Sequence, residues 1–143
     1  MKDLNEILGL NLNSAEIFHI DEEKLILLKE EDYFAKNDFY FWLLNKLMYL
    51  EDKNDKKSLA YGYYLMSYYL FVILTPLCYE DLSFNYIKKA ISLDNNINYK
   101  EWYLIFATLP KNYIKVYDAI KIAEEVLEEN PESNLAKVIL EMF

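Results

Sequence analysis

The stretch that decides the fold is SLAYGYYLMSYYLFVILT, residues 58–75, which contains no charged residue. As a helix it would be apolar in every direction instead of along one stripe, which is typical of a helix enclosed by other helices or by lipid. Its eighteen residues would span about 27 Å, which is marginal for a hydrocarbon core of about 30 Å. The stretch therefore predicts either a buried central helix or a membrane span.

The polar atoms of the stretch favour the buried helix. Five tyrosines, two serines and a threonine each carry a hydroxyl group. Each hydroxyl needs a hydrogen-bond partner, which hydrocarbon cannot supply but neighbouring helices can. We therefore expect residues 58–75 to form the central helix of the fold, with a membrane span as the alternative.

Composition points to an all-α protein. At 143 residues the chain has the length of one domain, and 54% of its residues are hydrophobic. Two glycines and three prolines are few for the tight turns of a β-sheet protein. We therefore expect a single helical domain over residues 1–143.

Charge and cysteine content limit the partners and the compartment. A net charge of −9 opposes binding to nucleic acid or to an anionic membrane surface, and it suits a basic protein partner. The single cysteine, Cys78, excludes an internal disulfide and fits a reducing compartment. The first ten residues, MKDLNEILGL, carry charges where a signal peptide needs an apolar run. These features predict a cytoplasmic protein.

Polar turns and N-cap residues divide the rest of the chain into helices. Asp21 can cap a helix that ends near residue 35, and Lys36-Asn37-Asp38 is expected to form a turn, with Asp38 as the next N-cap. Ser133 can cap the last helix. The predicted helices cover residues 2–8, 22–35, 39–50, 58–75, 81–93, 99–109, 113–129 and 134–142.

Six of these helices form three pairs: 22–35 with 39–50, 58–75 with 81–93, and 99–109 with 113–129. In the last pair, Trp102, Ala119, Ala123, Val126, Leu127 and Pro131 resemble the aromatic, small and closing positions of a tetratricopeptide repeat. The resemblance covers residues 58–133 and is weaker before them. It implies a right-handed stack of about three antiparallel helical hairpins, an α-solenoid whose concave face grips a peptide or another protein without catalysis. A generic helical array is the alternative.

No residue pattern predicts catalysis, a cofactor site or a metal site. A nucleophilic site would have to combine the only histidine, His19, with Cys78, and nothing near either residue supports that pairing. We expect His19 to be a partly packed structural residue. The chain is therefore expected not to be an enzyme.

Acidic clusters and tyrosines are the candidate partner-binding residues. A solvated helix face is the alternative explanation for the carboxylates, and a packed core for the tyrosines. At the C-terminal end of a helix, carboxylates oppose the helix dipole. The acidic cluster at residues 124–132 therefore does not stabilise its own helix, which favours a role in binding a partner. The predicted binding residues are Glu30, Glu31, Asp32, Tyr63, Tyr64, Tyr103, Glu124, Glu125, Glu128 and Glu129.

These features predict a non-enzymatic protein-binding module. The most concrete form is a small acidic inhibitor or chaperone that masks a basic partner, as an immunity protein masks a nuclease toxin. One alternative is an adaptor that binds a short peptide in a concave groove. Another is a subunit of a larger assembly. The sequence leaves the oligomeric state open.

Overall fold

The computed structural model describes residues 3–143, and these form helices and connecting loops without a strand. The all-α prediction is therefore confirmed. The chain divides into two compact units, the first ending at Leu93 and the second covering Asp94–Phe143. The expectation of a single domain stays a prediction.

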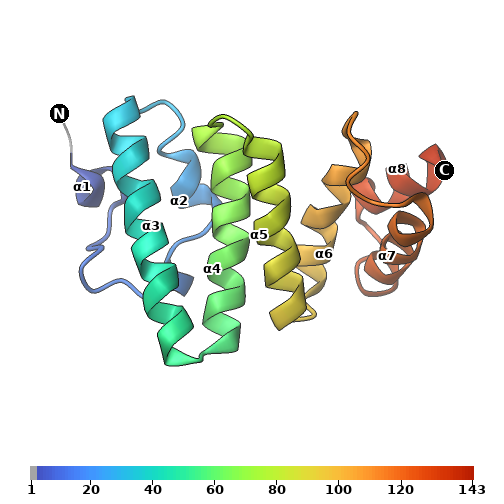
Figure 1. Ribbon diagram of the computed structural model, residues 1–143, viewed down its shortest axis with the longest axis horizontal. Helices are drawn as coiled ribbons and strands as arrows, with labels where there is room; N and C mark the ends of the chain where they lie inside the picture. Colours follow the sequence, from blue (N-terminus) through green and yellow to red (C-terminus); the bar gives the residue numbers. More distant parts are fainter. Residues whose placement is uncertain (1–2) are drawn as a thin grey trace. The chain divides into compact units, whose positions relative to one another are not determined.

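Three long helices make up most of the first unit. They are α3 (Tyr33–Lys53), α4 (Lys56–Tyr68) and α5 (Tyr79–Leu93), and α4 packs against both of the others (Figure 1). The chain before them forms α1 (Leu4–Leu8), a 3-10 turn at Ile17–His19 and α2 (Glu22–Ile26). The core of this unit therefore surrounds α4, as the uncharged stretch predicts.

The central helix begins and ends close to the predicted residues. The carboxylate of Asp55 accepts hydrogen bonds from the Ser58 backbone N–H at 3.3 Å and the Ser58 hydroxyl at 2.7 Å, which fixes the start of α4. Helical structure continues past Tyr68 as a π-turn, Tyr69–Leu74, and stops at Thr75, whose φ of 44° lies in the left-handed region. Eleven of the residues from Ala60 to Leu74 are buried, on every side of the helix.

Every buried side-chain nitrogen or oxygen among residues 3–143 has a hydrogen-bond partner. Four tyrosine hydroxyls of the central helix bind the preceding segments of unit 1. Tyr61 donates to the Ile20 carbonyl (2.5 Å), Tyr63 to the Glu51 carboxylate (2.9 Å), Tyr64 to the Glu22 carboxylate and Tyr69 to the Lys36 carbonyl (2.5 Å). The predicted hydroxyl partners are thus supplied by neighbouring protein segments.

Gly62 lies where α4 packs closely against α3. A Cβ atom at this position would stand 2.6 Å from Cδ2 of the buried Leu47 side chain. Because Leu47 is buried and protein cores are close-packed, Gly62→Ala is expected to cost about 1–3 kcal/mol in overpacking. The better helix propensity of alanine returns about 1 kcal/mol of this loss.

The test compares Gly62→Ala in two backgrounds by urea unfolding. We expect a net loss of up to about 2 kcal/mol in the native background. In a Leu47→Ala background, where the obstructing methyl group is absent, the same substitution should be neutral or stabilising. An equal loss in both backgrounds would show that the contact with Leu47 does not explain the glycine.

The first predicted helical pair is wrong. Residues 36–38 are not a turn but lie inside α3, which runs unbroken for 21 residues. The N-cap is Asp32, whose Oδ1 accepts a hydrogen bond from Ala35 N at 2.9 Å, and not Asp38. The helix predicted over 22–35 ends at Ile26, so no hairpin of residues 22–35 with 39–50 exists.

The second unit contains three helices. They are α6 (Ile97–Tyr103), which continues as a 3-10 turn at Leu104–Thr108, α7 (Val116–Glu129) and α8 (Asn134–Met142). The α7 helix packs against both α6 and α8. The last helix has the predicted bounds, and the Ser133 hydroxyl accepts a hydrogen bond from Ala136 N at 3.2 Å as its predicted cap. The tetratricopeptide arrangement of these helices stays a prediction.

No helix within residues 3–143 combines the length and the apolar character needed to cross a lipid bilayer. The membrane-span alternative for residues 58–75 therefore finds no support in the helices described.

Candidate functional site

The side of α3 opposite the core carries exposed apolar residues at regular spacing. Phe34, Phe41 and Met48 are 73%, 62% and 59% exposed. Seven residues advance a helix by about 700°, only about 20° short of two turns, so the three side chains form one stripe. The buried residues of α3 point to the other side of the helix: Ala35, Phe39, Leu43, Leu47 and Leu50. We call the stripe the α3 face.

Polar and acidic residues alternate with the apolar residues along the α3 face. Asp38 lies four residues after Phe34, Asn45 four residues after Phe41, and Asp52 four residues after Met48. All three polar residues are exposed. They lie on the same side of the helix, because residues four apart are neighbours on a helix surface. The face therefore offers apolar contacts interrupted by negative charge.

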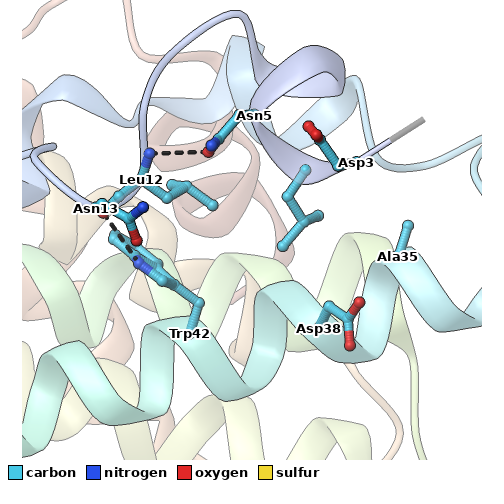
Figure 2. A pocket seen from close by; sticks show the side chains of 8 residues that line it. Asp3, Asn5, Leu12, Asn13, Ala35, Asp38 and Trp42 are labelled. Carbon is cyan, nitrogen blue, oxygen red and sulfur yellow. Dashed lines mark hydrogen bonds between the residues drawn. The ribbon is translucent and has the colours of Figure 1, made fainter.

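A cleft of about 540 Å³ lies between α1, the loop that follows it and α3. Figure 2 shows Asp38 and Trp42 on α3, with Asp3, Asn5, Leu12 and Asn13 on the opposite wall. Leu4 and Ala35 complete the lining. Because Asp38 belongs both to the α3 face and to this cleft, the two are neighbours.

Three hydrogen bonds within the protein engage groups of the cleft lining. Trp42 Nε1 donates to the Leu12 carbonyl at 3.3 Å, and Leu12 N donates to Asn5 Oδ1 at 2.9 Å. Asp3 Oδ1 accepts from Glu6 N at 2.9 Å, which caps α1. Among the described residues, Asp38 has neither a hydrogen bond nor an ion pair through its carboxylate. The groups left for a ligand include the Asp38 carboxylate, the side-chain amides of Asn5 and Asn13, and the ring of Trp42.

The predicted binding residues of the first unit lie in two different environments. Glu30, Glu31 and Asp32 belong to the turn before α3, and Asp32 is engaged as the N-cap. Tyr63 and Tyr64 are each only 8% exposed, so their rings contribute little area to any surface of this unit. The turn at residues 30–32 is close in sequence to the α3 face, because Phe34 follows Asp32 by two residues.

The remaining predicted residues belong to the second unit. Tyr103 is half-buried in α6, where burial and the charge of Asp118 raise the pKa of its hydroxyl. Glu125 is engaged in an ion pair, because its carboxylate lies 2.6 Å from Lys100 Nζ. Glu124, Glu128 and Glu129 are exposed on α7. Three carboxylates of this cluster are thus available at the surface, whereas Glu125 holds α6 against α7.

Buried tyrosines of the first unit titrate at unusually high pH. Burial raises the pKa of Tyr61 to about 12, and the nearby charges of Asp21 and Glu22 add to the rise. Burial also raises the pKa of Tyr69, whose ring is fully enclosed. In the unfolded chain these hydroxyls ionise near pH 10. The folded chain therefore keeps them protonated at higher pH than the unfolded chain does.

This difference predicts alkaline destabilisation. Between about pH 10 and pH 12 the unfolded chain binds fewer protons than the folded chain, so the free energy of unfolding falls as pH rises. Below about pH 10 the tyrosine contribution is fully present. Each retained proton contributes a slope of about 1.4 kcal/mol per pH unit, so Tyr69→Phe should flatten the fall by about that amount. Urea unfolding across this range checks it, and equal slopes in both proteins would contradict it.

His19 has a local structural role. Its Nδ1 accepts a hydrogen bond from Glu16 N at 3.2 Å and so closes the 3-10 turn, and the side chain is exposed. Cys78 is exposed in the loop after the π-turn. No group of three or more histidine, cysteine, aspartate or glutamate side chains within residues 3–143 is arranged to hold a metal ion.

The residues of the α3 face and the cleft were missed in the sequence analysis. The predicted turn at 36–38 separated Phe34 from Phe41 and concealed their spacing. A heptad search over 33–53 as one helix would have found Phe34, Phe41 and Met48. The cleft has no such signal, because it joins residues about thirty positions apart, such as Leu12 and Trp42.

Comparisons of the chain with protein-family models, with curated proteins and with solved structures found no match.

Proposed function

We propose that this chain is a non-enzymatic protein-binding module that masks a basic partner protein with the α3 face. The observation that carries the proposal is the exposed stripe of Phe34, Phe41 and Met48. Large apolar side chains that are more than half exposed and aligned along one helix are a common feature of protein interaction sites.

The geometry of the stripe suits a helical partner. From Phe34 to Met48 the stripe extends over about 21 Å, or four helical turns. A partner helix with apolar residues every three to four positions can pack along such a stripe, as in helix-in-groove recognition and in coiled coils. Burying a phenylalanine or methionine side chain contributes about 1.5–3 kcal/mol.

The charge of the face favours a basic partner. Asp38 and Asp52 lie between and beside the apolar residues, and the chain carries a net charge of −9. Lysine or arginine residues that flank the apolar positions of a partner helix would meet these carboxylates. A second copy of this chain would bring like charges together, which disfavours a homodimer through this face.

The test uses the salt dependence of an identified complex. Affinity capture from lysate of the source organism, followed by mass spectrometry, supplies the candidate, which is then purified and titrated against this chain. We expect a basic protein whose affinity falls about tenfold between about 0.05 M and 0.5 M salt, because screening weakens charge attraction. Salt-independent binding, or an acidic partner, would contradict the masking function.

The oligomeric state of the chain alone provides a second check. Light scattering at low salt should find a monomer, because the acidic face repels its own copy. A stable dimer that Phe41→Asp dissociates would show that the α3 face binds a second copy and not a basic protein.

A further inference from the structure

The cleft beside the α3 face has the chemistry of a cation site. Its lining includes two carboxylates, Asp3 and Asp38, and no described lining residue is positively charged. The Asp38 carboxylate has no partner among residues 3–143, and Asp38 also belongs to the α3 face. A cation entering here would neutralise charge that the protein itself leaves unpaired.

The second feature of the cleft is the Trp42 indole. Its N–H group already donates to the Leu12 carbonyl at 3.3 Å, so the ring cannot offer a donor to a ligand. What remains is its π-system, which attracts a cation that lies over the face within about 6 Å. Leu4, Leu12 and Ala35 supply apolar lining that can contact an aliphatic chain. The cleft thus combines negative charge, an aromatic ring and apolar contacts.

We propose that the cleft between α1 and α3 receives the side-chain ammonium group of a lysine that the partner protein presents. The inference rests on the proposed function, because it identifies one anchoring residue of the partner. The four-carbon lysine stem packs against Trp42 and the apolar lining, and the ammonium group lies between Asp3 and Asp38. The three N–H donors of the ammonium group point in different directions, which suits the carboxylates of Asp3 and Asp38 on opposite walls of the cleft. The planar guanidinium fork of arginine instead matches a single carboxylate.

Lysine recognition can be tested without the partner. The probe is Nα-acetyl-lysine-methylamide, titrated into the full chain while NMR follows the Trp42 Nε1–H resonance, assigned with Trp42→Phe. We expect saturable shifts in the millimolar range, since a single side chain provides few contacts. The control ligand is Nα-acetyl-norleucine-methylamide, which has the same aliphatic stem and no charge, and it should bind at least about fivefold more weakly.

Two variants of equal charge change locate the site. Asp38→Asn should weaken lysine binding about three- to fivefold, whereas Asp52→Asn, fourteen residues further along the same helix, should leave it unchanged. Equal effects of the two variants, equal binding of norleucine, or tighter binding of the arginine analogue would overturn the lysine assignment.

The partner complex separates this inference from the proposed function. If Phe41→Asp abolishes partner binding and Asp38→Asn has no effect beyond that of Asp52→Asn, the α3 face binds a partner but the cleft does not receive its lysine. If the lysine probe binds as expected and no basic partner is found, the cleft is a cation site and the masking function is wrong.

Discussion

Replacing Phe39 with alanine is expected to lower the free energy of unfolding by about 3–5 kcal/mol. The ring is fully buried between α3 and the central helix, with centroids 4.9 Å from Tyr69 and 5.7 Å from Trp42. Its removal leaves a cavity at the junction that sets the position of α3, and the close-packed neighbours can refill it only in part. Urea unfolding followed by circular dichroism measures the loss.

The matched control is Phe41→Ala, the same substitution two residues further along α3. Phe41 lies on the exposed side, so its truncation should change the free energy of unfolding by less than about 0.5 kcal/mol. Similar losses for the two variants would show that the buried and exposed sides of α3 have been assigned wrongly.

Replacing Phe41 with aspartate is expected to weaken partner binding by at least about 2 kcal/mol, or about thirtyfold. Phe41 is the middle residue of the stripe, and central, fully desolvated side chains dominate interface energies. The new carboxylate would also lose its water on binding without a matched cation in the interface. Isothermal titration calorimetry with the purified partner measures the change.

Leu77→Asp is the control for this experiment. Leu77 is the most exposed large apolar residue of the described chain, at 90%, and it lies in the loop between the π-turn and α5. The substitution adds the same charge and removes similar apolar area away from the α3 face. If Leu77→Asp weakens binding as much as Phe41→Asp, general charge repulsion and not the stripe explains both results.

Where the sequence carried a strong local signal, the helix bounds could be predicted. The uncharged run before Pro76 and the cap at Ser133 are strong helix signals, and the central and last helices lie close to the expected residues. The tyrosine hydroxyls were correctly expected to need protein partners. The identity of those partners, such as the Ile20 and Lys36 carbonyls, depends on packing between distant segments.

The interruption predicted at residues 36–38 shows why α3 was not predicted as one helix. Lysine, asparagine and aspartate in succession are typical of a turn, and Asp38 is a plausible N-cap. The local preference of these residues is weak, and burial of Ala35 and Phe39 on one side of a continuous helix outweighs it. Asp32 supplies the cap six residues earlier.

The candidate site was harder to predict than the fold. Composition predicted acidic clusters and tyrosines as partner-binding residues. In the structure, Tyr63 and Tyr64 are core residues, and Glu125 forms an ion pair with Lys100. Composition does not distinguish a side chain that serves packing from one that faces a partner. The α3 face depends on helix continuity, and the cleft depends on how the segment before α2 returns to α3.

The two sides of α3 thus have different physical roles. One side, centred on Phe39 and Leu43, stabilises the first unit by packing against the central helix. The other, centred on Phe41, adds little to stability and is proposed to bind the partner. Substitutions on the exposed side should therefore separate partner binding from folding.

The most direct measurement of the central claim is the footprint of the identified partner on this chain by backbone NMR. We predict that saturating partner shifts the amide resonances of residues 34–52, with the largest changes around Phe41. Residues 124–129 of α7, which carry the other exposed acidic cluster, should be unaffected. A footprint confined to α7, with α3 unchanged, would contradict the assignment of the α3 face as the protein-binding surface.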